Sequence, residues 1–373
     1  MRLGLIGTGR IGAFHAATLR SLAGVDRVTV ADADAGRARA LAASLELECA
    51  GGIEELYAAG LDGVVITAAT SAHATLIHQA LDHEVPVFCE KPVAPDVPGT
   101  VAVVERAASG TVPVQIGFQR RFDAGYLAAR QALRSGELGW VHTLRACTSD
   151  MVPPPASYVP TSGGLFRDCG IHDFDILRWV TGREVVSVFA AGANKGEDFF
   201  AAGDDVDTCA ALLRFDDDTL ATATATRYNG AGYDVRLEVC GSRDTRIVGL
   251  DDRAPLPSAE PGRPGPHPTG PDQAGAQGTG PGANAVAPGP AGERGTPYAT
   301  FLERFHDAYV AELAAFVDVA AGRAANPCPA AEALEALYVA EACDTSRRTG
   351  LPVAVSDVRS RRAPGAGVTG SSR

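Results

Sequence analysis

The stretch Asp168-Cys169-Gly170-Ile171-His172-Asp173-Phe174-Asp175 contains side chains that could remove a proton from a hydroxyl group. A spacing of four residues places Asp168 and His172 on one face of a helix, with Asp175 one turn further along. Histidine titrates near neutral pH and can act as a general base, and a neighbouring carboxylate would orient its ring. The structural alternative is that Asp168, which follows two glycines, caps a helix N-terminus. We interpret Asp168 and His172 as a catalytic pair.

Lys91 is the next candidate, because lysine is rare in this chain. Of the 33 basic residues only Lys91 and Lys195 are lysines, and the others are arginines. An ammonium is a compact charge, whereas a guanidinium is a rigid planar fork. Lys91 follows the strand-like segment 85–89, and ligands of open α/β sheets bind beyond the carboxyl ends of the strands. An ammonium there could hold a substrate hydroxyl and stabilise the alkoxide that develops as hydride leaves; the alternative is a surface lysine in a polar loop.

The pattern Gly7-Thr8-Gly9-Arg10-Ile11-Gly12 indicates dinucleotide binding, because a strand-like segment precedes it and a helix-like segment follows it. The glycines permit a tight turn and the close approach of a pyrophosphate to a helix N-terminus. Asp32, 20 residues beyond Gly12, would bind the adenine ribose and disfavour a 2′-phosphate, so NAD is the expected cofactor, although Arg37 could offset this preference. The predicted cofactor contacts are Gly7, Gly9, Arg10, Ile11, Gly12, Asp32, Thr70, His73, Glu90 and Lys91; for His73 a role at a helix N-terminus is the alternative.

Alternating strand and helix patterns position these residues in the first third of the chain. Strand-like segments at 3–7, 28–31, 63–67, 85–89 and 112–117 alternate with helix-like segments, which predicts a parallel sheet of βαβ units. A strand-like segment at 141–148 is followed by a helix-like segment at 168–181, and from residue 185 strand-like segments follow one another, which predicts a large, mostly antiparallel open sheet. We therefore expect an α/β protein with a Rossmann domain at 1–119 and a substrate-binding and oligomerisation α+β domain at 120–358. The Gly/Pro-rich segment 255–297 is expected to be a mobile insertion and the tail 359–373 to be disordered.

Composition excludes several classes of function. The net charge of −12 argues against a nucleic-acid or anionic-membrane surface. No apolar run reaches the roughly 20 residues that span a bilayer, and no signal peptide precedes the first strand-like segment, so we expect a cytoplasmic protein. The eight cysteines are scattered without a C-x-x-C pair, which favours free thiols over a metal site; no metal is expected.

Taken together, these motifs resemble the Gfo/Idh/MocA oxidoreductases, and above all the inositol 2-dehydrogenases. The matching stretches are Gly7–Gly12 with His15, Glu90-Lys91-Pro92, Gly117–Asp123 and Asp168–Asp175. The resemblance implies that Lys91, Asp168 and His172 form the catalytic group, with His172 as the base, Asp168 as its partner and Lys91 holding the reacting oxygen. It also implies homodimers or homotetramers formed through the C-terminal sheet. The substrate contacts that we predict are Lys91, Arg121, Asp150, Asp168, His172, Asp175 and Tyr233.

The chain departs from that pattern at one point, because Thr148 and Asp150 stand where the inositol enzymes offer His and Asn. We expect NAD-dependent oxidation of a ring hydroxyl of myo-inositol or a related cyclitol or sugar, with hydride passing to nicotinamide C4. The alternatives are an oxidoreductase of a hexose or amino-sugar, and a non-catalytic NAD-sensing regulator. Intact Lys91, Asp168 and His172 argue against the regulator, since a sensor needs no base.

Overall fold

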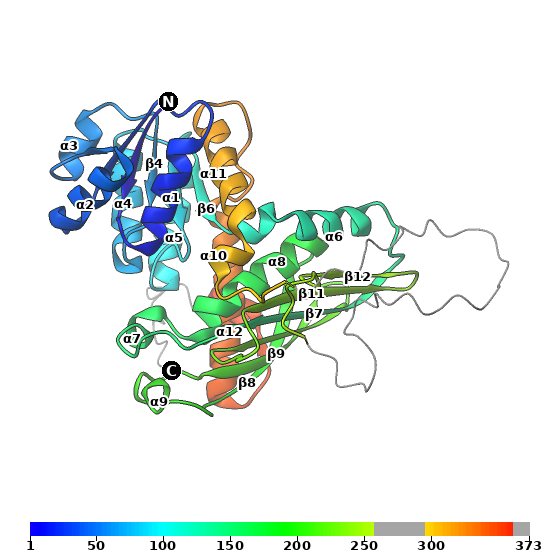
Figure 1. Cartoon of the computed structure of the whole chain (residues 1–373). Coiled ribbons are helices and arrows are strands. Elements are labelled where there is room, and N and C mark those ends of the chain that lie inside the picture. Colours follow the sequence, from blue (N-terminus) through cyan, green and yellow to red (C-terminus); the bar gives the residue numbers. More distant parts are fainter. Residues whose placement is uncertain (257–294, 361–373) are drawn as a thin grey trace, which may run out of the picture.

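The computed structural model describes residues 1–256 and 295–360, which form two sheets with their covering helices (Figure 1). The first sheet has the order β3-β2-β1-β4-β5-β6, and all its strands are parallel. This is the doubly wound order of a Rossmann fold, as the alternating sequence pattern predicts. Its strands are β1 (Arg2–Ile6), β2 (Arg27–Ala31), β3 (Glu48–Cys49), β4 (Gly63–Ile66), β5 (Val87–Glu90) and β6 (Val114–Gly117). Its helices are α1 (Arg10–Ser21), α2 (Ala35–Leu45), α3 (Ile53–Ala58), α4 (Thr70–Asp82) and α5 (Val97–Ala108).

Apolar residues on both faces of these strands make the parallel sheet a buried layer. Side chains of one strand point alternately to the two faces: Leu3 and Leu5 of β1 pack on one face of the sheet, and Ile6 packs on the other. Such continuous apolar runs are typical of strands covered by helices on both sides. The carboxyl ends of β1 and β5, which precede Gly7 and Lys91, lie at one edge of this layer.

The second sheet has the order β12-β11-β7-β10-β9-β8-β13, and only the pairing of β7 with β10 is parallel. The mostly antiparallel sheet is therefore confirmed. Leu213 and Phe215 of β9 are buried while Leu212 and Arg214 are exposed, an alternation that arises because helices cover one face only. Its strands are β7 (Val141–Ser149), β8 (Val185–Ala193), β9 (Thr208–Phe215), β10 (Leu220–Thr226), β11 (Asp234–Gly241), β12 (Thr245–Val248) and β13 (Val353–Ala354).

Two C-terminal helices tie the sheets together. Helix α11 (His306–Ala320) returns to the first sheet, where Leu313, Phe316 and Val317 pack with Leu3 and other strand residues. Helix α12 (Ala330–Thr349) contacts α5 of the first domain and α8 (Ile171–Thr181) and β8 of the second. Figure 1 shows α11 beside the first domain and α12 below it, against the second sheet. The division of the chain at 119 and 120 stays a prediction.

Several short elements escape the sequence patterns because they are too short to show a period. They are β3, α3, α7 (Val159–Ser162), α9 (Phe199–Ala202), β13 and α13 (Val355–Ser360). The remaining helices of this part are α6 (Ala124–Arg134) and α10 (Phe301–Arg304). Arg359, assigned by sequence to the tail, lies in α13 and pairs with Glu335. Most of the Gly/Pro-rich segment, 257–294, and residues 361–373 lie outside the described residues. Within residues 1–256 and 295–360, no helix combines the length and apolar character that crossing a membrane requires.

The predicted helix from Asp168 to Thr181 begins differently from the expectation. Residues Phe166–Gly170 form a π-helical turn, and the regular α8 starts only at Ile171. A π turn bonds residues five apart, so side chains before it are rotated relative to those after it. Because four residues still make about one turn, His172 lies one turn after Asp168, and the contacts of the two side chains decide whether they pair.

Candidate active site

Lys91 and Asp168 meet although 77 residues separate them in the sequence. Lys91 follows β5, and its Nζ donates hydrogen bonds to the backbone oxygen of Asp168 at 2.8 Å and to its carboxylate Oδ1 at 3.3 Å. Both side chains are mostly buried. An ammonium has three N–H groups, so one remains for a ligand. Lys91 is thus an anchored cation at the edge of the sheet where the glycine turn also lies.

Asp168 is held by more cations and donors than the sequence suggested. Its Oδ2 accepts a hydrogen bond from Arg227 at 2.7 Å, and its Oδ1 accepts one from the Tyr158 hydroxyl at 3.0 Å. Burial raises the pKa of Asp168, but the Lys91 and Arg227 charges outweigh burial and lower this pKa to about 2. The carboxylate therefore stays ionised throughout the neutral range.

His172 follows one turn later on α8, without a hydrogen bond to Asp168. Its Nδ1 is buried and has no partner among the described residues, and the edge of its ring meets Phe118, with ring centroids 5.9 Å apart. Burial, and then the charges of Lys91 and Arg120, lower the pKa of His172 well below its usual value. The neutral imidazole is therefore the resting form, and the predicted role of Asp168 as its hydrogen-bonding partner is not realised.

Sequence reasoning missed Arg227 and Tyr158. Arg227 immediately follows β10, and Tyr158 lies in the Pro-rich loop before α7. The parallel pairing of β7 with β10 sets Thr226 opposite Ser149, so Arg227 and Asp150 leave the sheet at the same edge. A prediction of this parallel pairing would have identified Arg227. The sequence pattern did not provide it, because strands that follow one another in sequence favour antiparallel pairing.

The two positions that depart from the inositol enzymes have different environments. Thr148 is buried, where its hydroxyl accepts from Arg120 at 2.9 Å and donates to Asp173 at 2.8 Å. Asp150 remains partly exposed, and its Oδ2 accepts from Arg227 at 3.0 Å. Of the two, only Asp150 belongs to the cluster around Asp168.

Tyr233 is buried next to the start of β11. Burial raises the pKa of its hydroxyl well above the usual value, while the nearby Arg120 opposes this shift. The charge of the Asp150 carboxylate also raises the pKa of that hydroxyl. Its contact with substrate stays a prediction.

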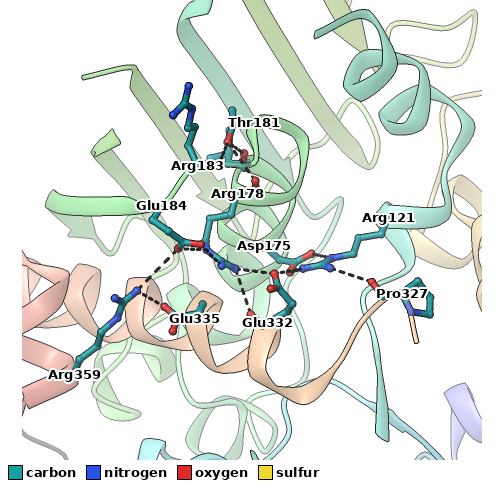
Figure 2. A network of polar contacts seen from close by, with 11 residues as sticks. Arg121, Asp175, Arg178, Thr181, Arg183, Glu184, Pro327, Glu332, Glu335 and Arg359 are labelled. Carbon is teal, nitrogen blue, oxygen red and sulfur yellow. Dashed lines mark hydrogen bonds and ion pairs between the residues drawn. The ribbon is translucent and has the colours of Figure 1, made fainter. Parts of the chain in front are cut away.

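Arg121 and Asp175 form a buried ion pair of their own. Nε and Nη2 of Arg121 donate to the two oxygens of Asp175 at 2.9 and 2.6 Å, and Nη2 also reaches Glu332 at 3.2 Å. Figure 2 shows this pair continuing through Glu332 to Arg178. None of these hydrogen bonds reaches Lys91, Asp168 or His172, and the contact of Arg121 and Asp175 with substrate stays a prediction.

The glycine turn has the shape that a bound dinucleotide needs. Gly7 has φ +99°, and a Cβ there would lie 2.5 Å from the Ala68 nitrogen. A Cβ on Gly12 would collide with the Gly7 carbonyl oxygen, so Gly12 permits α1 to pack on the turn. Gly9, by contrast, faces open space at the N-terminus of α1, where a pyrophosphate would lie. Arg10 and Ile11 open the same helix, and the Arg10 guanidinium lies over the Phe301 ring at 5.1 Å.

Three further residues predicted to contact the cofactor are Asp32, Thr70 and His73. Asp32 follows β2, and its Oδ2 accepts from the Thr8 backbone at 2.6 Å, with Arg37 at 3.7 Å from Oδ1. Thr70 opens α4. His73 is buried, with Nδ1 at 2.7 Å from the Pro92 oxygen and Nε2 at 2.9 Å from the Ala68 oxygen.

These contacts give His73 and Glu90 supporting positions. Both ring nitrogens of His73 face backbone carbonyl oxygens, so neither is left to hydrogen-bond NAD, and a contact of His73 with the cofactor stays a prediction. The Glu90 carboxylate lies 2.7 Å from His15 Nε2 and is partly buried. Each therefore steadies the segment around Lys91. In residues 1–256 and 295–360, no group of three or more His, Cys, Asp and Glu side chains could hold a metal ion.

Replacing Gly9 with alanine should weaken dinucleotide binding without lowering stability. The added methyl meets no protein atom within 4 Å, but it occupies the space that a pyrophosphate needs. We expect an increase of about tenfold or more in the NAD dissociation constant, measured by calorimetry, with an unchanged melting temperature. Gly110→Ala, at another glycine that faces open space, is the matched control. Wild-type affinity in the Gly9→Ala protein would contradict this placement.

Comparison with known proteins identifies both domains. Residues 1–118 match the model of an oxidoreductase family with an NAD-binding Rossmann fold, and residues 126–246 match that of the GFO/IDH/MocA C-terminal domain. The myo-inositol dehydrogenase Hyg17 of Streptomyces leeuwenhoekii is 37% identical over 358 residues, which cover 95% of this chain and 100% of that protein.

Two solved structures have the same fold over nearly the whole chain. A myo-inositol dehydrogenase from Corynebacterium glutamicum gives a TM-score of 0.80 at 30% identity and covers 95% of this chain and 98% of that chain. A scyllo-inositol dehydrogenase from Lactobacillus casei, solved with NAD(H) and scyllo-inositol, gives 0.79 at 26% identity and covers 95% and 99%. Together with the two matched domains, these likenesses mean that the chain belongs to the Gfo/Idh/MocA family of oxidoreductases.

Proposed function

We propose that this NAD-dependent dehydrogenase oxidises a ring hydroxyl of myo-inositol or a related cyclitol to the ketone. The observation that carries the proposal is the Lys91–Asp168 pair at the carboxyl end of β5, with a neutral His172 nearby and the glycine turn at the same sheet edge. The relatives named above act on myo-inositol and scyllo-inositol, and one was solved with NAD(H) and its cyclitol.

In this proposal each side chain has a separate task. The third N–H of Lys91 holds the reacting oxygen and stabilises the negative charge that develops on it. His172, neutral at rest, takes the hydroxyl proton as general base. Asp168 fixes the Lys91 ammonium instead of the imidazole. NAD, held at the glycine turn, would supply the acceptor for the hydride of the substrate carbon.

The charges of the cluster favour a neutral substrate. Lys91 and Arg227 carry two positive charges, and Asp168 and Asp150 carry two negative ones, with His172 uncharged. This cluster has no excess positive charge to bind a phosphorylated or carboxylated ligand, whereas it offers a polyol both hydrogen-bond donors and acceptors. This supports an uncharged cyclitol or sugar.

The proposal is tested by following NADH formation at 340 nm with a panel of inositol isomers, hexoses and amino-sugars, each with NAD and with NADP. We expect turnover of at least one inositol isomer, with NAD preferred because an acid at Asp32 would bind the adenine ribose and disfavour a 2′-phosphate. An amino-sugar or amino-cyclitol is the second candidate, since the Asp150 carboxylate suits an ammonium better than an amide would. Turnover of hexoses or amino-sugars alone would favour that candidate, and no turnover of any polyol would contradict the dehydrogenase proposal.

We further propose that the protein forms a homodimer or homotetramer through the open face of the second sheet. A row of paired residues crosses that face from Phe189 through Leu212 to Ile247, and all three are more than 40% exposed. Thr222, Arg145 and Glu238 lie in the same row between Leu212 and Ile247, so the face combines exposed apolar residues with polar and charged ones. Exposed apolar residues within a polar surround support an interface. Sedimentation velocity of the full chain measures the number of subunits in the assembly.

We propose a cytoplasmic location because the eight free thiols suit a reducing compartment.

A further inference from the structure

Arg227 joins two carboxylates that come from different elements. Its side chain is only 4% exposed. Nη2 donates to Asp168 Oδ2 at 2.7 Å, and Nη1 donates to Asp150 Oδ2 at 3.0 Å and lies 2.9 Å from Cys169 Sγ. Asp168 belongs to the π turn before α8, and Asp150 follows β7. A single buried guanidinium therefore fixes the relative position of the two acids.

The two acids differ in what they leave for a ligand. Both oxygens of Asp168 are engaged, Oδ2 by Arg227 and Oδ1 by Lys91 and Tyr158. Asp150 uses only Oδ2, and none of the described residues donates to its Oδ1. The Asp150 side chain is 23% exposed. A partly buried carboxylate oxygen needs a donor, and an incoming hydroxyl can supply it.

We propose that Arg227 is a positioning residue that sets substrate selectivity, because it holds Asp150 at a fixed place relative to Lys91. When the reacting hydroxyl is bound by Lys91, a second hydroxyl of the ring must point toward Asp150 Oδ1 for the substrate to make both contacts. The proposal rests on the function proposed above. Epimers differ in the direction of one hydroxyl, so a rigid pair of contacts distinguishes them.

The guanidinium suits this task for a geometric reason. It is planar, and its two terminal nitrogens direct their N–H groups along fixed lines, so the two acids cannot rotate independently. A lysine at 227 would supply the charge from a single flexible point. Arg227→Lys should therefore keep the charge balance and lose the fixed geometry.

The test measures the ratio of kcat/KM values for pairs of inositol epimers with wild-type enzyme, Arg227→Lys, Arg227→Met and Asp150→Ala. We expect each variant to reduce the preference for the favoured epimer about tenfold or more, since lost hydrogen-bond recognition of a hydroxyl has effects of at least that size. The double variant Asp150→Ala/Arg227→Met should reduce the preference no further than Asp150→Ala alone, because Arg227 acts through Asp150. The NAD dissociation constant should be unchanged in all of them.

Arg178→Met is the matched control. Arg178 is also 4% exposed and also pairs with two carboxylates, Glu184 and Glu332, but it lies in the network of Figure 2. Its loss should lower the melting temperature and leave the epimer ratio unchanged. If Arg227→Met does not fold, Arg227→Lys and Asp150→Ala still decide the question.

The outcomes separate the two proposals. If the wild-type enzyme oxidises no cyclitol or sugar, the proposed function fails, and the selectivity inference fails with it. If the wild type is active and both Arg227→Lys and Asp150→Ala keep the wild-type epimer ratio, the proposed function stands and the role of Arg227 is refuted. An equal change of ratio in Arg178→Met would also refute it, because the effect would then follow from lost stability.

Discussion

Lys91→Arg should lower kcat for cyclitol oxidation by about a hundredfold to a thousandfold, the cost of losing one positioned donor to a developing oxyanion. The positive charge is kept, so the loss measures geometry. Steady-state NADH formation at saturating NAD measures the effect, and thermal unfolding checks that the fold is intact. KM for the polyol should change less than kcat, because the contact strengthens as the hydroxyl loses its proton.

The physical reason lies in how the ammonium is held. Its Nζ donates to the Asp168 backbone oxygen at 2.8 Å and to the Asp168 carboxylate at 3.3 Å, which leaves the third N–H for the reacting oxygen. A guanidinium is larger and planar, and a fork that satisfies both Asp168 acceptors directs its remaining donors elsewhere.

Lys195→Arg is the natural control, since Lys195 is the other lysine of the chain and is exposed in the loop after β8. That variant should have wild-type kcat and stability. Normal turnover in Lys91→Arg would refute the assigned contact with the reacting oxygen. Lys91→Met, which removes the charge as well, should be at least as impaired as Lys91→Arg.

The first domain could be predicted closely because its signals are local. The Gly7–Gly12 turn, the apolar strands on either side and Asp32 all lie within one βαβ unit, and each constrains the backbone near itself. The meeting of Lys91 with Asp168 is not local, and the family resemblance predicted that both belong to one site.

The errors arose where tertiary contacts decide. Nothing in the local pattern signals the π turn at Phe166–Gly170, which contains Asp168 and delays the start of the regular α8 to Ile171. Arg227 was missed because its role follows from the parallel pairing of two strands that are not neighbours in sequence. The contacts of His73, Arg121 and Asp175 with ligands stay predictions, and protein groups already hydrogen-bond these side chains. Sequence identifies which groups can do chemistry, and packing decides which of them remain available.

His172→Gln should lower kcat/KM for cyclitol oxidation by about a hundredfold to ten-thousandfold, the usual contribution of a positioned general base. Glutamine keeps a polar side chain of similar length but cannot accept a proton near neutral pH. Because burial, Lys91 and Arg120 lower the pKa of His172, the wild-type imidazole is neutral well below pH 6.5. The wild-type kcat/KM should therefore not fall through His172 protonation as the pH decreases past 6.5, and that loss should begin only at lower pH.

The same shift predicts a change in stability that needs no substrate. A histidine whose folded pKa lies below its unfolded value binds fewer protons when folded, so the protein loses unfolding free energy as the pH falls below about 6.5. His172→Gln removes that loss, and the variant should gain stability relative to wild type at pH 5 compared with pH 8, measured by denaturant unfolding at both pH values. His142→Gln, at an exposed position on β7, is the control for both measurements. A fall of the wild-type kcat/KM centred at pH 6.5 that disappears in His172→Gln would mean that the His172 imidazole is solvated and has its usual pKa. A general base in the buried environment described here would then be excluded.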